Sequence, residues 1–112
     1  MKIAQRQKDQ VDYFEISGDL DFNSSPELKE KLQQAFAKQA KSIVINLKKV
    51  GYIDSSGLAT FVDALKKTKA VSGKLILTDL SDAVRSVFEI AKLDQIFTLV
   101  ESETEAVRLF TP

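Results

Sequence analysis

Histidine and cysteine are absent from the 112-residue sequence, and each absence removes whole classes of chemistry. Without an imidazole there is no Ser-His-Asp hydrolase, no histidine phosphocarrier and none of the usual zinc sites. Without a thiol there is no disulfide framework and no thiolate metal site, which is compatible with a reducing compartment. A Ser-Lys hydrolase survives on composition, but Ser55, the serine of interest below, has no lysine at the Ser-x-x-Lys spacing. We therefore do not expect an enzyme.

An excess of either charge and a long apolar run are missing as well. The 16 basic and 16 acidic residues cancel, whereas a nucleic-acid partner would require a basic excess on one face. The longest purely apolar runs have three residues, such as Ile43–Ile45, and a membrane span needs about 20. The N-terminus is polar and lacks the apolar stretch of a signal peptide. We expect a cytoplasmic protein with no nucleic-acid partner and no direct membrane insertion.

The composition is that of one soluble domain, with 44% apolar and 29% charged residues. A chain of this length buries roughly two-thirds of its unfolded surface, which is enough for one core without metal or disulfide support. There is no low-complexity linker and no internal repeat. We expect a single domain over residues 1–112.

Hydrophobic periodicity predicts strands that alternate with helices after an opening hairpin. The predicted strands are 3–7, 11–17, 42–47, 74–78 and 96–100. Helices are predicted after a hydroxyl cap in Ser24-Ser25-Pro26-Glu27, from the Asp54-Ser55 turn to about residue 70, after Ser81 and after Ser102. The order β-β-α-β-α-β-α-β-α indicates an α/β fold with a mixed, mostly parallel sheet and helices packed against it.

Each predicted helix has an apolar stripe at helical spacing, which we expect to face the sheet. Residues 42–47 are almost uninterrupted in apolarity, as expected of a central strand covered on both faces. The four stripes are Leu28, Leu32, Ala35 and Phe36; Leu58, Phe61, Val62 and Leu65; Val84, Val87, Phe88 and Ala91; and Ala106, Val107 and Phe110.

The turn Asp54-Ser55-Ser56-Gly57-Leu58 follows the central strand. In open α/β sheets, function gathers where the carboxyl ends of strands meet the amino ends of helices. Asp54 or Ser55 is suited to cap the free N–H groups of the helix, and Gly57 leaves room for a partner's backbone or a phosphate to approach. The same residues are equally suited to capping alone, without any function. Local physics leaves both interpretations open.

A chain-wide pattern favours the functional interpretation. Its segments are Gly18-Asp19-Leu20-Asp21, residues 28–32, residues 53–58, residues 84–88 and residues 93–97. In order and spacing they resemble the STAS domain family, most closely its bacterial anti-sigma factor antagonists. The resemblance covers essentially the whole chain, and Asp-Ser-Ser-Gly-Leu is its most specific block.

The resemblance implies a phosphorylation switch. In that family a GHKL-type serine kinase, which is also the anti-sigma factor, phosphorylates the serine after the aspartate, and that position is Ser55 here. The unphosphorylated antagonist binds the anti-sigma factor and releases the sigma factor, and a serine phosphatase restores it. No cofactor or metal is implied, and the loop 18–24 is expected beside Ser55. The expected partner-binding residues are Asp21, Asn23, Ser24, Asp54, Ser56 and Gly57.

One position departs from the pattern. Ala59 stands where many sigma-pathway relatives have a second glycine, and relatives that serve as accessory subunits of membrane lipid transporters differ there too. The alternative function is therefore a non-catalytic STAS subunit of a lipid-transport ABC ATPase. Those relatives usually have a non-phosphorylatable variant around the glycine, whereas this chain keeps both Ser55 and Ser56, which favours the switch.

Overall fold

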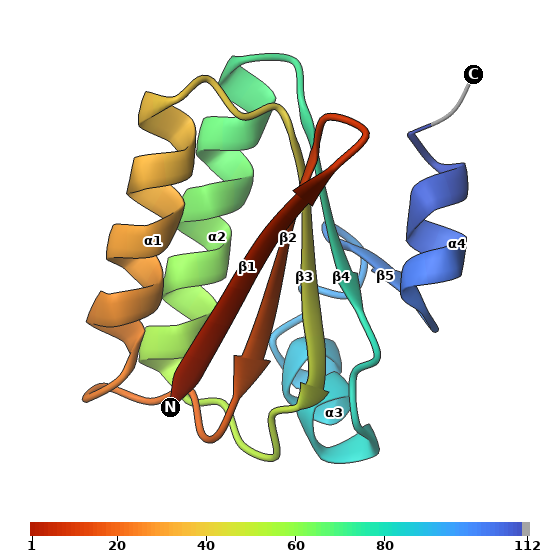
Figure 1. The fold of residues 1–112 in the computed structure, drawn as a ribbon. Coiled ribbons are helices and arrows are strands. Elements are labelled where there is room, and N and C mark those ends of the chain that lie inside the picture. The colour runs from red at the N-terminus through yellow and green to blue at the C-terminus, as the bar shows by residue number, and fades with distance from the viewer. Residues whose placement is uncertain (111–112) are drawn as a thin grey trace.

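The structure, a computed structural model that describes residues 1–110, is built on a five-stranded sheet (Figure 1). The strands lie in the order β1 (Lys2–Lys8), β2 (Val11–Ser17), β3 (Ser42–Lys49), β4 (Lys74–Thr78) and β5 (Thr98–Val100). β1 pairs with β2 antiparallel, and the other three pairings are parallel. The predicted mixed, mostly parallel sheet is confirmed.

In the part of the chain that the structure describes, helices cover both faces of the sheet, three on one face and one on the other (Figure 1). The helices are α1 (Ser25–Ala37), α2 (Ser55–Ala70), α3 (Asp82–Ile90) and α4 (Glu103–Arg108). α1, α2 and α3 share the first face, and α4 packs on the second. The predicted element order is confirmed. Among the described residues, no helix has both the length and the apolarity to cross a membrane.

The main core lies between the first sheet face and α1–α3. Phe14 and Ile16 of β2 point to this face and are fully buried, as expected from the period of two in a strand. The Phe88 ring of α3 packs edge-on against Phe97, with centroids 5.5 Å apart, and lies 6.1 Å from the Phe61 ring of α2. These aromatic contacts fix α3 against α2 and therefore against the sheet.

A second, smaller core lies under α4. It comprises Val11, Tyr13, Val44, Ile76 and Ala106. Within residues 1–110, β3 is the only strand with five consecutive buried residues, Ile43–Leu47, because helices cover it on both faces. The prediction of a doubly covered central strand is confirmed.

Three predicted details are wrong near the C-terminus. The last strand begins at Thr98, not Ile96, because the amides of Ile96 and Phe97 both donate to the Leu93 carbonyl and form a turn. Ala91 is exposed because α3 has already ended. Val107 is 40% exposed, since α4 is only six residues long and rests on the sheet through Ala106.

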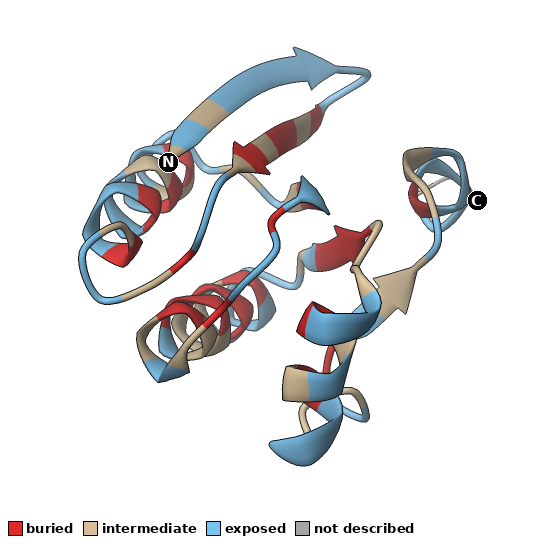
Figure 2. Cartoon of the chain, turned by 90° about the horizontal axis from the view of Figure 1, so that it is seen from below, coloured by how far each residue is buried: buried red, intermediate tan, exposed pale blue. Residues whose placement is uncertain are grey.

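The carboxyl ends of β2 and β3 and the amino ends of α1 and α2 meet at the lower edge of the molecule in Figure 1. Figure 2 looks onto this edge from below and shows exposed loop segments between the strands and the helices. The loops 18–24 and 50–54 leave β2 and β3 here. The edge therefore brings together two segments that are about thirty residues apart in the sequence.

Candidate functional site

Asp54 begins α2 as its N-cap, with an extended backbone (φ −107°, ψ −173°). One carboxylate oxygen, Oδ1, accepts hydrogen bonds from the amides of Ser56 at 2.8 Å and Gly57 at 3.1 Å. The Leu58 amide donates to the Asp54 carbonyl at 3.0 Å. Asp54 thus satisfies amides that a helix start leaves without partners.

The other carboxylate oxygen of Asp54 reaches a different segment. Asp54 Oδ2 accepts from the amide of Phe22 at 3.0 Å. The two segments are also joined by backbone: the Leu20 amide donates to the Tyr52 carbonyl at 2.9 Å, and the Asp54 amide donates to the Leu20 carbonyl at 3.1 Å. The expected position of loop 18–24 beside the turn is therefore what the structure shows.

Loop 18–24 is held by its own polar side chains. The Ser24 hydroxyl donates to the Asp19 carbonyl at 2.8 Å and accepts from the Asp21 amide at 2.9 Å. Asp21 Oδ1 accepts from the amides of Asn23 and Ser24 at 3.0 and 3.1 Å, an Asx turn. The hydrogen bond from the Ser24 amide is the main cause that lowers the pKa of Asp21 below its usual range.

One expectation about this loop is wrong, namely the hydroxyl cap at the start of α1. Ser24 occupies the N-cap position of α1 but makes no side-chain hydrogen bond to the helix. Its hydroxyl is already used inside the loop, with Asp19 and Asp21. Ser24 therefore stabilises the shape of the loop and not the start of α1.

The two serines of the turn differ in accessibility. Ser55, the first residue of α2, is exposed, whereas Ser56 is half-buried. The Ser56 carbonyl also accepts from the Thr60 hydroxyl at 3.0 Å. Of the two hydroxyl groups, that of Ser55 is the more accessible to a second protein.

Gly57 is buried, which changes the interpretation of its missing side chain. A Cβ atom placed there would lie 2.7 Å from Ile53 Cγ1 and 3.0 Å from both Leu20 Cγ and the Leu20 carbonyl oxygen. The space that was expected to admit a partner is filled by Leu20 and Ile53. Glycine is required because loop 18–24 packs directly on the first turn of α2.

The structure thus gathers the expected partner-binding residues at one edge. Asp54 connects Ser56 and Gly57 on α2 with loop 18–24, which contains Asp21, Asn23 and Ser24. The sequence did not single out two neighbours, Phe22 and Tyr52, which are 76% and 54% exposed. Both could have been noticed in the sequence, because each is an aromatic residue in a segment that no predicted strand or helix includes.

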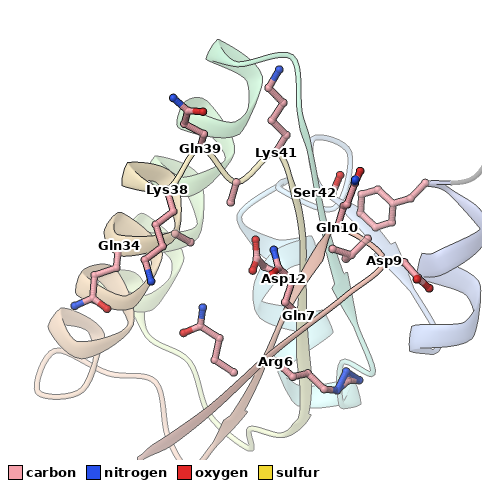
Figure 3. A pocket seen from close by; sticks show the side chains of 15 residues that line it. Arg6, Gln7, Asp9, Gln10, Asp12, Gln34, Lys38, Gln39, Lys41 and Ser42 are labelled. Carbon is pink, nitrogen blue, oxygen red and sulfur yellow. The ribbon is translucent and has the colours of Figure 1, made fainter.

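A hollow lies at the opposite end of the sheet from this site (Figure 3). It has a volume of about 780 Å³ and lies between the β1–β2 hairpin and the end of α1. Its lining is mainly polar and includes Asp12, Gln34 and Lys38 (Figure 3). Burial raises the pKa of Asp12, and the charge of Lys38 opposes that change. Within residues 1–110, no three acidic side chains gather closely enough to hold a metal ion.

The fold, with loop 18–24 packed on the first turn of α2, is that of a known family. The STAS domain family model matches residues 2–106, and the chain belongs to the STAS domain family. A curated relative, the anti-sigma-B factor antagonist of Listeria monocytogenes, is 34% identical over 94% of this chain and 91% of its own length. The extent of the domain over residues 1–112 stays a prediction.

Solved structures share the fold. An anti-sigma factor antagonist from Mycobacterium paratuberculosis is 22% identical, with a TM-score of 0.88 over 96% of this chain and 92% of that chain. The Bacillus cell fate determinant SpoIIAA in its phosphorylated form is also 22% identical, with a TM-score of 0.78 over 98% of this chain and 100% of that chain. The resemblance inferred from the sequence is confirmed at the level of family and fold.

Proposed function

We propose that this chain is an anti-sigma factor antagonist that works as a phosphorylation switch. In its unphosphorylated form it binds a GHKL-type serine kinase, which is also the anti-sigma factor, and so releases the sigma factor. The kinase phosphorylates Ser55, and a serine phosphatase removes the phosphate. The protein acts in the cytoplasm as a binding protein and not as an enzyme.

The proposal rests on the exposed Ser55, which directly follows Asp54, the residue whose carboxylate ties loop 18–24 to α2. Two features support it: the chain belongs to the STAS domain family, and curated relatives are anti-sigma-B factor antagonists. We assign the expected partner surface to Asp21, Asn23, Ser24, Asp54 and Ser56. Gly57 contributes by letting loop 18–24 pack on α2, because it is buried.

The local electrostatics explain how a phosphate would act. Phosphoserine adds roughly −1.5 to −2 charges near neutral pH. The amides of Ser56 and Gly57 already donate to Asp54, so the phosphate would stand beside a carboxylate and not in an empty cradle of amides. Binding to a partner surface that is shaped for a neutral hydroxyl would become weaker by about 2 to 3 kcal/mol, which is roughly 30- to 150-fold in affinity.

The fold should tolerate the modification. Ser55 is exposed at the amino end of a sixteen-residue helix, where the helix dipole favours negative charge. We therefore expect Ser55→Asp to fold like the wild type while losing partner affinity. Phosphorylation would block the contact directly and would not need a refolding step.

Mapping the phosphate by mass spectrometry tests the assignment. The purified protein is incubated with the anti-sigma factor kinase of the same genome and ATP, alongside Ser55→Ala and its matched neighbour Ser56→Ala. We expect one phosphate on the wild type and on Ser56→Ala, and none on Ser55→Ala. Equal labelling of Ser55→Ala, or a phosphate on another residue, would refute the switch.

The alternative, a non-catalytic subunit of a lipid-transport ABC ATPase, is favoured by one residue. Ala59 replaces the second glycine and is exposed on the first turns of α2. Co-purification with an ABC ATPase, and no phosphate transfer from a GHKL-type kinase, would favour this second function.

A further inference from the structure

The polar hollow of Figure 3 begins where the inner side of the β1–β2 hairpin changes from apolar to polar. Ile3 of β1 packs against the main core, but the next residues on the same side of the strand are Gln5 and Gln7. Gln7 lies directly opposite Asp12 of β2, so the amide and the carboxylate share this face of the sheet. The apolar core therefore ends where the hollow begins.

Two opposite charges line this hollow without forming an ion pair. Asp12 is half-buried, and burial raises its pKa, while the nearby positive charge of Lys38 opposes that change. Figure 3 shows the Lys38 side chain in the space between the end of α1 and the hairpin. Within residues 1–110, neither of these two side chains belongs to an ion pair. A carboxylate that is partly removed from water and has no partner costs free energy, which a ligand cation would recover.

The other charged side chains of the lining do not fill this gap. Arg6 already pairs with Glu103. Figure 3 shows Lys41 and Asp9 pointing away from the space between α1 and the hairpin, and both are exposed and opposite in sign. One carboxylate and one ammonium group therefore dominate the field inside the hollow. A polyanion such as a nucleotide would be repelled by the carboxylate, and a simple cation would be repelled by the ammonium group.

We propose that the hollow binds a free amino acid in its zwitterionic form. The ammonium group of the ligand faces Asp12, and its carboxylate faces Lys38. Gln5, Gln7 and Gln34 also line the hollow. Their side-chain amides have no hydrogen-bond partner within residues 1–110, so each offers donors and an acceptor to the ligand. A volume of about 780 Å³ is within the usual size of a small-molecule site.

Thermal unfolding in the presence of each standard amino acid at millimolar concentration is the first test. A ligand that binds the folded state raises the melting temperature. Calorimetric titration then compares the amino acid that has the largest effect with acetate and methylammonium, which carry one charge each. We expect the amino acid to bind at least about tenfold more tightly than either single-charge probe, because only the zwitterion satisfies both charges of the hollow.

Three variants locate the binding. Asp12→Asn and Lys38→Gln each remove one charge of the hollow, and we expect each to weaken amino-acid binding about tenfold or more. Lys66→Gln is the control, because Lys66 is exposed on α2 and does not line the hollow, and it should leave the affinity unchanged. Circular dichroism establishes that each variant folds. In NMR spectra of the wild type, the ligand should shift the side-chain amide signals of Gln7 and Gln34.

Several results would overturn the zwitterion site. They are an absence of binding by every amino acid, an affinity that both hollow variants leave unchanged, and acetate binding as tightly as the amino acid. Amide shifts confined to loop 18–24 would place the ligand at the other end of the sheet and would overturn it as well. All these measurements use the protein without a kinase, so their outcome leaves the Ser55 switch standing or falling on its own test.

Discussion

Single residues decide what the site is able to do. Ser55 and Ser56 are adjacent and chemically identical, yet only the first is exposed. Ser56 is half-buried and lines the space between the first turns of α1 and α2. Gly57 permits the packing of Leu20 on α2. The arrangement presents one hydroxyl and supports it with a tightly packed turn.

Thr78 provides a test of the packing at residue scale. It is fully buried at the end of β4, and within residues 1–110 its hydroxyl has no hydrogen-bond partner. Thr78→Val replaces the hydroxyl by a methyl group of similar size, so we expect the free energy of unfolding to rise by about 1 kcal/mol. Urea denaturation measures this.

Thr68 is the matched control. It is also fully buried, but its hydroxyl donates to the Ala64 carbonyl at 2.7 Å. Thr68→Val removes a satisfied hydrogen bond and should bring no gain. If both variants were destabilised alike, the Thr78 hydroxyl would have a partner and the description of this part of the core would be incorrect.

At residue scale, sequence reasoning identified the polar groups but not all of their partners. Asp54 and Ser81 were expected near helix starts, and both cap helices. Ser24 looked the same in the sequence, yet its hydroxyl bonds within loop 18–24. A cap requires the hydroxyl to face its own helix, and that orientation depends on a loop conformation that local sequence does not determine.

At the scale of elements, the central feature is the contact between loop 18–24 and α2. Asp54 uses one carboxylate oxygen for the helix and the other for the Phe22 amide. A bridge between Leu20 and Ile53 continues the β2–β3 pairing beyond the strands. One side chain therefore stabilises a helix start and the loop that flanks the proposed phosphorylation site.

Asp54→Ala tests this double role. It removes the α2 cap and the tie to Phe22 together, and we expect it to lower the free energy of unfolding by about 1 to 2 kcal/mol. Ser81→Ala removes the cap of α3 alone and is expected to cost about 1 kcal/mol or less. Hydrogen exchange of the Phe22 amide should increase in Asp54→Ala and not in Ser81→Ala. Unchanged exchange in both variants would show that the tie contributes nothing.

Hydrophobic periodicity predicted the type of each element correctly where the apolar pattern was long. The stripes of α1 and α2 and the apolar run of β3 gave the correct element type, because burial on one or both faces imposes a period. The pattern was misleading at residues 96–100. Ile96 and Phe97 have the composition of a strand, but a turn after α3 uses their amides, and the short β5 begins only at Thr98.

At the scale of the whole molecule, α4 is held to the sheet by a polar contact as well as by the second core. The side-chain amide of Asn46 donates to Glu103 Oε2 at 2.7 Å. Glu103 also pairs with Arg6, whose guanidinium lies 4.2 Å from the centroid of the Tyr13 ring. Burial alone would raise the pKa of Glu103, but the hydrogen bonds from Asn46 and Arg6 and the Arg6 charge lower it below its usual range.

This lowered pKa predicts an acid-sensitive contribution to stability. Because the folded protein holds Glu103 in its charged form, the contribution is complete at pH values well above the ordinary pKa of a glutamate and is lost as the pH falls through the lower folded pKa. We expect Glu103→Gln to reduce the free energy of unfolding by about 1 kcal/mol at pH 7. The difference from wild type should shrink toward pH 3. A difference that does not depend on pH would contradict the assignment.

The site as a whole could be predicted only in part. The Asp-Ser-Ser-Gly-Leu block and the chain-wide pattern located Ser55 and the loop 18–24. The groove between the first turns of α1 and α2 could not be foreseen, because Phe22 and Pro26 on one side of it lie about thirty residues before Ala59 on the other. Only the packing of α1 beside α2 brings them together, and a local sequence pattern does not predict which helices pack side by side.

The dissociation constant of the anti-sigma factor kinase complex, measured before and after phosphorylation, tests the central claim most directly. The protein phosphorylated at Ser55 should bind roughly 30- to 150-fold more weakly than the unphosphorylated protein. Ser55→Ala treated with kinase and ATP should keep the unphosphorylated affinity. Equal dissociation constants for the two forms of the wild type would contradict the switch.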